Sequence, residues 1–254
     1  MRNKIGIVLL ATNAYFVLGV RFIKKFRHYY KGDAEVTFFF FSEEDPNPYI
    51  PTEQVKWYEE SHANWQDGTN SKFKNILKIG KELEDVDYVY YFDADTNISK
   101  EFTEEWFLGD LVGGEHFGNR GWLKNGAGFD RNPISHAYVP LDSTLPYTYH
   151  YGAFFGGVVK NVLKFCETLY YYQTEDKKIN YEPPVNDESY INAYFHFHPP
   201  TYTVPTEKFM FDISDKGGIG ETRNINLDIS KLKQQMLENK DNLFDIANGK
   251  MIIK

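Results

Sequence analysis

The sequence predicts an α/β protein in which helices flank a mixed sheet, and three apolar segments carry this prediction. Lys4–Leu10 and Ala34–Phe41 are short, nearly continuous apolar runs, and a third such run ends at Asp93. Runs of this kind are typical of strands that are buried on both faces of a mostly parallel sheet. Segments with helical spacing separate them, so residues 1–97 alternate between strand and helix.

The two intervening helices place loops at one edge of this sheet. A helix is expected from Ala14 to Tyr30, where apolar residues recur at helical spacing and Asn13 offers an N-cap. A second helix is expected from about Ser71 to Leu83 and leads into the third strand. Because such folds bind ligands at the carboxyl ends of their strands, the loops Ala11–Tyr15 and Ser42–Glu44 are candidate walls of a site.

The second half of the chain is richer in glycine. The passage from Gly113 to Gly128 is expected to be largely irregular. In Tyr149–Gly157, small residues lie between aromatic ones, so the backbone could approach a flat ligand. The end of the chain is expected to be mobile. The remaining expected elements are helices at 158–172 and from 186 or 187 onward, a strand at 202–204 and a polar helix at 227–243.

Composition narrows the possible partners and compartment. The 254 residues are 42% apolar, which is ample for a core, and carry a net charge of −8 without a cluster of Lys and Arg. Nucleic acid is therefore not expected as the main partner, since phosphate backbones require a basic surface. The single cysteine, Cys166, favours a reducing compartment. With no transmembrane segment and no signal peptide in the sequence, we expect a soluble, cytoplasmic protein, or a chain trimmed to resemble one.

Two carboxylates follow the third strand. In a strand, residues two apart share a face, so Asp93 and Asp95 are expected to point the same way. Hard oxygen ligands suit magnesium or manganese, which take further ligands from water and from a substrate's phosphates. The alternative is a strand that simply ends in a polar turn.

Two classes of phosphate-using enzyme carry Asp-x-Asp after an apolar strand. Haloacid-dehalogenase phosphatases use the first Asp as a nucleophile, but here Thr96 comes one position too early for their pattern and the motif lies well inside the chain. Nucleotide-sugar glycosyltransferases place the motif after a first α/β half, where a metal bridges the diphosphate. The second class fits this sequence better.

Three motifs follow one another along the chain: FDADTN at 92–97, YGAFFGG at 151–157 and NDESYIN at 186–192. In this order and spacing, they together resemble family 6 glycosyltransferases, which include the blood-group A and B transferases and α1,3-galactosyltransferase. The segments LATNAY at 10–15, WQD at 65–67 and DRNPISHAYVP at 130–140 are also similar. The resemblance spans residues 4–212 and suggests a soluble member of bacterial or phage type.

The resemblance implies a GT-A fold, that is, a Rossmann-like mixed sheet flanked by helices, in one catalytic domain over residues 1–254. Residues 1–97 would be the nucleotide-binding half, 98–212 the sugar- and acceptor-binding half, and 213–254 a C-terminal loop and helix. The implied reaction moves a hexose from a UDP-sugar to a hydroxyl of a glycan or glycolipid. It retains the anomeric configuration and forms an α-linkage, α1,3 in the family.

The resemblance also assigns the metal and the chemistry. Asp93 and Asp95 would hold Mn²⁺ or Mg²⁺, with Asp95 the more direct ligand. Glu188 matches the family's key carboxylate, acting either as nucleophile or as stabiliser of an oxocarbenium-like transition state. Asp187 would hold hydroxyls of the donor or acceptor.

Further residues are implied to contact the donor. The loop carrying Ala11, Thr12 and Tyr15 would hold uracil and ribose. Ala153 narrows the space for an acetamido group, which favours an unsubstituted, galactose-like hexose, while glucose and N-acetylgalactosamine stay open. Lys72 stands where the family has an arginine and lacks that residue's bidentate fork. The other implied donor contacts are Tyr151, Gly152, Lys216 and Arg223.

The acceptor side matches the family less closely. His116, Val185 and Asp212 fall at implied acceptor positions, and Val185 replaces a tryptophan, so an unusual acceptor is expected. Outside the transferase interpretation, a sugar-binding module that kept the fold and lost the chemistry is the competing hypothesis.

Overall fold

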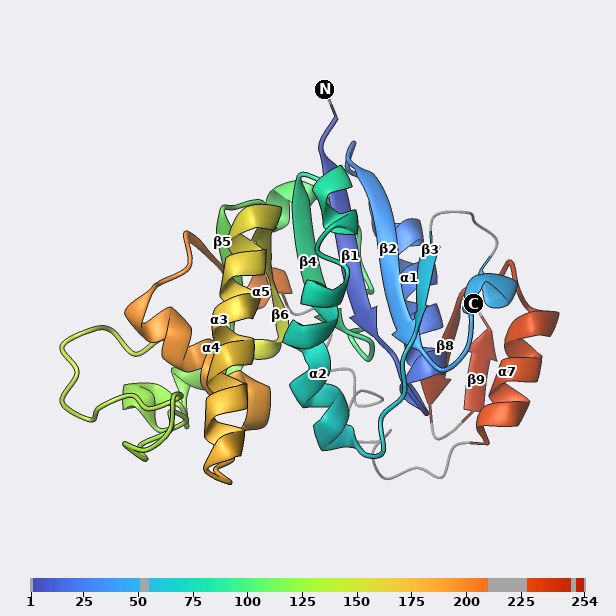
Figure 1. Ribbon diagram of the computed structural model, residues 1–254. Helices are drawn as coiled ribbons and strands as arrows, with labels where there is room; N and C mark the ends of the chain where they lie inside the picture. The colour runs from blue at the N-terminus through green and yellow to red at the C-terminus, as the bar shows by residue number, and fades with distance from the viewer. Residues whose placement is uncertain (1, 51–54, 210–227, 248–249, 254) are drawn as a thin grey trace. The chain divides into compact units, whose positions relative to one another are not determined.

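The computed structural model describes residues 2–50, 55–209, 228–247 and 250–253. It confirms the predicted fold class, because helices accompany one mixed sheet of seven strands in the order β3-β2-β1-β4-β6-β5-β7 (Figure 1). The chain divides into two compact units, the first comprising residues 1–62, 91–106 and 210–254, and the second residues 63–90 and 107–209. The boundary falls within β4, Tyr88–Asp93.

The first unit is organised around three parallel strands and one helix. β1 (Lys4–Leu10) pairs with β2 (Glu35–Ser42), and β2 pairs with β3 (Val55–Glu59). The four phenylalanines from Phe38 to Phe41 are fully buried in β2. α1 (Tyr15–Tyr29) presents aromatic side chains to them, with Phe16 and Phe40 edge to face at 5.9 Å. Dense aromatic packing thus explains much of the high Phe content.

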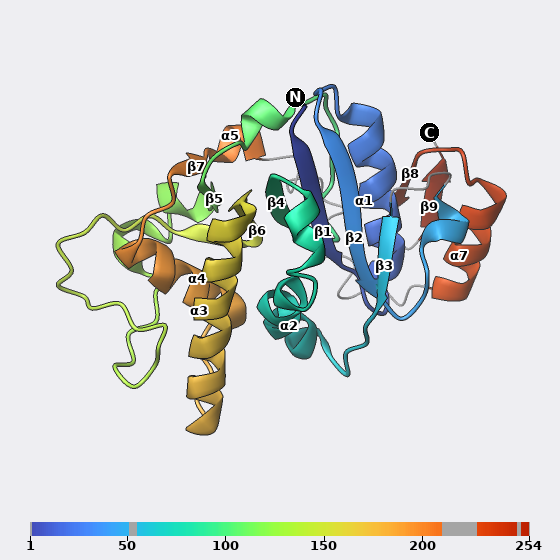
Figure 2. The ribbon, with the colours of Figure 1, turned by 45° about the horizontal axis from the view of Figure 1, so that its top comes forward.

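The C-terminal part of the first unit lies beside α1. It consists of α7 (Ile229–Glu238) and the antiparallel strands β8 (Phe244–Ala247) and β9 (Lys250–Ile253) (Figure 2). The end that was expected to be mobile contains these two strands, and Phe244 and Ile246 of β8 are buried. The polar helix was expected over 227–243 but ends at Glu238.

Two further expectations for the first unit need correction. Asn13 does not cap α1. It has a positive φ of 56°, and the N-cap position is Ala14, which makes no side-chain cap. β3 was not predicted, since its segment has no clean alternation in sequence.

Among the described residues, the second unit contains the remaining strands of the large sheet, apart from the end of β4, and four α-helices. β6 (His150–Val158) pairs antiparallel with β5 (Leu111–Glu115), which pairs in parallel with β7 (Tyr202–Val204). Its helices are α2 (Trp65–Lys78), α3 (Val159–Lys178), α4 (Asn186–Phe197) and α5 (Thr206–Phe209). Gly156 allows β6 to approach β4 closely, because a Cβ there would lie 2.1 Å from the Tyr90 ring.

Several bounds in the second unit differ from expectation. α2 begins at Trp65 rather than Ser71, because the Asn64 side chain accepts a hydrogen bond from the amide of Asp67 and caps the helix there. The glycine-rich passage contains β5, and 149–157 is mostly the regular strand β6. Neither of the expected caps of α4 is in place, since Val185 occupies that position without a side-chain cap.

Candidate active site

The first turn of α4 presents Glu188 to the start of β6 in the second unit. The amide of Gly152 donates a hydrogen bond of 2.6 Å to Glu188 Oε2. The hydroxyl of Tyr149 donates a second hydrogen bond to the same carboxylate. Burial nevertheless raises the pKa of Glu188 to about 7, and the neighbouring Asp187 adds to the rise. A carboxyl group with such a pKa, held by two hydrogen-bond donors, is a candidate catalytic group.

A buried ion pair lies beside this carboxylate. Lys72 Nζ, from α2, is 2.8 Å from Asp187 Oδ2, and their side chains are 5% and 4% exposed. Lys72 Nζ also donates to the carbonyl of Gly152 at 3.1 Å. The structure therefore brings together four of the predicted site residues, Lys72, Gly152, Asp187 and Glu188. The amide of Gly152 donates to Glu188, and its carbonyl accepts from Lys72.

Space around Gly152 is tight. A Cβ at this position would lie 3.1 Å from the Cβ of Glu188 and 3.2 Å from Asp187 Oδ2. Gly152 thus lets the backbone of β6 reach both carboxylates.

Asn192, which the sequence did not single out, fixes α4 to β6. It is fully buried. Its Oδ1 accepts from the amide of His150 at 2.7 Å, and its Nδ2 donates to the carbonyl of His150 at 2.9 Å. The same Nδ2 donates to the carbonyl of Glu188 at 2.8 Å. The side chain of Asn192 therefore makes the two hydrogen bonds to the His150 backbone that a neighbouring strand would make. It also sets the position of the Glu188 backbone. Its place in the motif at 186–192 was the only sequence signal.

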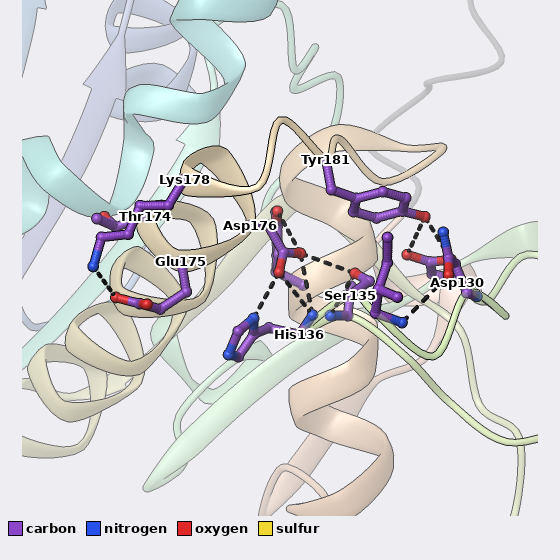
Figure 3. A network of polar contacts seen from close by, with 12 residues as sticks. Asp130, Ser135, His136, Thr174, Glu175, Asp176, Lys178 and Tyr181 are labelled. Atoms are coloured by element: carbon purple, nitrogen blue, oxygen red, sulfur yellow. Dashed lines mark hydrogen bonds and ion pairs between the residues drawn. The ribbon is translucent and has the colours of Figure 1, made fainter.

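A polar network around Asp176 joins the end of α3 to the segment 130–140 (Figure 3). Asp176, near the end of α3, is fully buried and accepts from Ser135 Oγ at 2.9 Å and from the amide of His136 at 3.0 Å. Tyr190 of α4 donates to the same carboxylate at 3.1 Å. Tyr181 donates to Asp130 at 2.9 Å. The segment 130–140 is thus connected by hydrogen bonds, through Asp176, to the helix that carries Glu188.

The acceptor residues predicted in the second unit lie in two places. His116 is buried, and its ring centroid is 4.2 Å from that of Tyr151 and 5.7 Å from that of Tyr149, which donates to Glu188. Its Nδ1 accepts from the amide of Gly118 at 2.9 Å, and burial lowers the pKa of His116 to about 4. Val185 is 38% exposed at the start of α4. Ala153 lies in β6, after Gly152.

The Asp-x-Asp segment belongs to the first unit and differs from the expected geometry. β4 ends at Asp93, and Asp95 lies in a turn closed by a hydrogen bond of 3.0 Å from the amide of Thr96 to the carbonyl of Asp93. The argument from strand alternation is therefore wrong for this pair, because it holds only within a strand. Tyr91 donates to Asp93 Oδ1 at 2.8 Å, and Arg21 donates to the carbonyl of Asp95 at 3.1 Å.

The donor set at this turn fits a hard divalent cation that shares its coordination with a substrate. Asp93 is partly exposed and Asp95 is buried, and both offer carboxylate oxygens. Within the described ranges, no group of three His, Cys, Asp or Glu side chains is placed to hold a metal ion. A cation held by Asp93 and Asp95 would thus take other ligands from water and from a diphosphate.

The predicted nucleotide loop surrounds the end of β1 in the first unit. Ala11 is fully buried, whereas Thr12 is 8% exposed and Tyr15 is partly exposed at the first position of α1. The amide of Asn13 donates to Glu43 at 3.0 Å, which joins the two loops proposed as site walls.

His62 is a member of this loop cluster that sequence reasoning missed. Its Nδ1 lies 3.3 Å from Thr12 Oγ1, and its carbonyl accepts from the Asn13 side chain at 3.1 Å. No periodic or motif signal surrounds His62 in the sequence.

The remaining predicted residues, Asp212, Lys216 and Arg223, lie outside the described residues. None of the helices in the described ranges is long and apolar enough to cross a membrane. The cytoplasmic location stays a prediction.

Comparison with known sequences gives a consistent picture. A model of the family described as glycosyltransferase family 6 matches residues 1–239. The chain is 26% identical to histo-blood group ABO system transferase 2 of Rattus norvegicus over 220 residues, 84% of this chain and 65% of that protein. It is 25% identical to globoside alpha-1,3-N-acetylgalactosaminyltransferase 1 of Gallus gallus over 222 residues, 84% of this chain and 63% of that protein.

A bacterial relative is also similar. The O-antigen biosynthesis glycosyltransferase WbnI of Escherichia coli is 28% identical over 140 residues, 54% of this chain and 58% of that protein. The chain spans less than two thirds of the length of each of these three relatives.

Proposed function

The chain belongs to glycosyltransferase family 6, and we propose that it transfers a hexose from a UDP-sugar to a glycan hydroxyl with retention of configuration. The acceptor would be a glycan or glycolipid, and the new bond an α-linkage, α1,3 as in the names of the globoside relatives. The observation that carries the proposal is the Glu188 carboxylate, which is held by Gly152 and Tyr149 beside the buried Lys72–Asp187 pair.

Retention of configuration requires that the new bond form on the same face of the anomeric carbon that UDP leaves. As UDP departs, positive charge develops on the sugar, and a negative group on the opposite face can act in two ways. It either attacks the anomeric carbon and is then displaced by the acceptor hydroxyl, or it stabilises the charge while the acceptor hydroxyl attacks from the face that UDP leaves and gives up its proton to the departing diphosphate. Glu188 is the group we assign to this role. The hydrogen bonds from Gly152 and Tyr149 fix its orientation before the donor arrives, so little reorganisation accompanies the reaction.

Asp187 and Lys72 would set the position of the sugar. Lys72 pairs with Asp187 and holds this second carboxylate next to Glu188, where it can accept hydrogen bonds from sugar hydroxyls. Ala153 follows directly in β6 and favours an unsubstituted hexose over an N-acetylhexosamine.

The donor's diphosphate would bind at the other set of predicted residues. We propose that Asp93 and Asp95 hold Mn²⁺ or Mg²⁺, while Thr12 and Tyr15 receive ribose and uracil. When bound, the cation supplies positive charge that stabilises the leaving diphosphate. Tyr91 and Arg21 orient the segment that carries the two carboxylates.

A panel of UDP-sugars, assayed for hydrolysis without acceptor, tests the proposal. We expect release of UDP from one or more UDP-hexoses in the presence of Mn²⁺, with UDP-galactose preferred over UDP-N-acetylgalactosamine. Binding of UDP without turnover of any sugar would indicate a sugar-binding module instead. Release of phosphate from simple esters, independent of uridine, would indicate a phosphatase that uses Asp93 as nucleophile.

A further inference from the structure

The most deeply buried cation of α1 is Lys25, and its partners lie far apart in sequence. Lys25 is 1% exposed. Its Nζ donates to Asn97 Oδ1 at 2.6 Å and forms an ion pair with Asp245. Asn97 lies two residues after Asp95, and Asp245 lies in β8. One buried ammonium thus joins the Asp-x-Asp segment to the C-terminal strands within the first unit.

The same face of α1 holds the Asp-x-Asp segment at a second point. Arg21, four residues before Lys25 and therefore on the same side of the helix, donates to the carbonyl of Asp95 at 3.1 Å. Arg21 is 3% exposed and Asn97 is 6% exposed. The backbone of Asp95 and the side chain of Asn97 are thus both held by cations that the helix buries.

The C-terminal strands are anchored on α1 around Asp245. Phe244 and Ile246 are buried, and strand alternation turns Asp245 to the opposite side from them. Lys24 donates to the carbonyls of Lys240 at 2.6 Å and Asn242 at 3.1 Å, which fixes the chain that leads into β8. The match to the family model ends at residue 239, so β8 and β9 lie beyond it.

We propose that the C-terminal strands support the donor site indirectly. Asp245 fixes Lys25, and Lys25 positions Asn97 and the segment that carries Asp93 and Asp95. Asp245 and Lys25 are positioning residues, since they act through Asn97 and touch no reacting group. The inference rests on the proposed function, because it assumes that Asp93 and Asp95 bind the donor's diphosphate through a cation.

The physical argument is the cost of a buried charge. A buried ammonium needs a paired carboxylate and further hydrogen bonds. Without the Asp245 carboxylate, the buried ammonium of Lys25 has lost its paired charge and moves towards other partners. Its hydrogen bond to Asn97 is then lost or weakened. Partners of this kind behind metal ligands typically change metal affinity by 10- to 100-fold.

Asp245→Asn is the test, because it removes the charge and keeps the shape. We expect the Kd for UDP in the presence of Mn²⁺, measured by calorimetry well below the Tm, to rise about tenfold or more. The KM for the UDP-sugar should rise by more than kcat falls. Lys24→Met is the matched control, since Lys24 contacts the same C-terminal chain but not Asn97. It should lower the Tm and leave the Kd for UDP unchanged.

A double variant tests whether the effect passes through Lys25. Because Asp245 and Asn97 share this partner, Asp245→Asn and Asn97→Ala should raise the Kd by less together than the product of their separate effects. Multiplicative effects would overturn the proposed connection.

Hydrogen exchange gives a reading that needs no ligand. Amides of the segment 92–99 should exchange faster in Asp245→Asn than in the wild type, and at the wild-type rate in Lys24→Met. Unchanged exchange and an unchanged Kd in Asp245→Asn would overturn the inference while leaving the proposed function intact. If the wild type does not bind UDP with Mn²⁺, the proposed function fails and the inference fails with it.

Discussion

The amide of Gly152 and the carboxylate of Glu188 are joined by a hydrogen bond of 2.6 Å between a strand and the first turn of a helix. A second donor, Tyr149, reaches the same carboxylate from the residue before that strand. The result is a carboxylate held in a fixed place while burial opposes its ionisation, an arrangement that favours function over stability.

The stability of the protein should therefore depend on pH through Glu188. Burial raises its pKa from 4.5 to about 7, so between these values the folded protein binds more protons than the unfolded chain. The contribution of Glu188 to stability thus falls as the pH rises through this window and is lowest above pH 7. Glu188→Gln should raise the free energy of unfolding at pH 8 by up to about 3 kcal/mol, and by less at pH 5. Urea unfolding at both pH values measures this, and an equal effect at both would contradict the assigned pKa.

Breaking the buried ion pair should be costly. Lys72→Met leaves Asp187 buried without its cation, and we expect a loss of about 3–5 kcal/mol in the free energy of unfolding. Adding Asp187→Asn to this variant should recover much of the loss, because the buried charge disappears. The pair of the exposed Lys178 and the partly exposed Glu175 offers a control, since Lys178→Met should change stability little. A loss no larger than that of the control would show that Lys72 is not needed to balance Asp187.

Asn192→Leu should destabilise the protein and impair catalysis together. The change leaves the amide and carbonyl of His150 without their side-chain partner, at a cost of about 1–3 kcal/mol for each group. The carbonyl of Glu188 loses the same partner, so kcat should fall as well. Urea unfolding and steady-state kinetics check both effects. Lower stability with unchanged kcat would mean that Asn192 holds the fold but not the position of Glu188.

The chelator EDTA should abolish turnover, and Mn²⁺ should restore it. The expectation follows from the two carboxylates at the end of β4, which need a cation to bind a diphosphate. Asp95→Asn should weaken the response to Mn²⁺, which a titration of activity with metal can measure. Full activity in EDTA would place the chain among transferases that work without metal.

Local patterns in the sequence predicted the framework of the fold well. The strands at 4–10 and 202–204 have the expected bounds, because a nearly continuous apolar run marks the first and strand-favouring residues between prolines mark the second. The start of α2 was missed because the residues that follow Trp65 in its first turns are polar or small, so the start depends on the cap rather than on periodicity. Strand alternation does not apply to Asp93 and Asp95 as a pair, because β4 ends at Asp93.

Long-range partners could not be predicted in the same way. Lys25 looks like a solvated charge in its own helix and is buried only because Asp245, 220 residues later, and Asn97 receive it. Asn192 gives no local signal either, since its role depends on the neighbouring strand. Such residues become visible only when the tertiary structure brings their partners together.

The most direct test of the account compares Glu188→Gln with the wild type in the hydrolysis of a preferred UDP-hexose and in UDP binding. We predict that kcat falls by at least about a hundredfold, while the Kd for UDP in the presence of Mn²⁺ stays at the wild-type value. Turnover at the wild-type rate in Glu188→Gln would contradict the role assigned to this carboxylate.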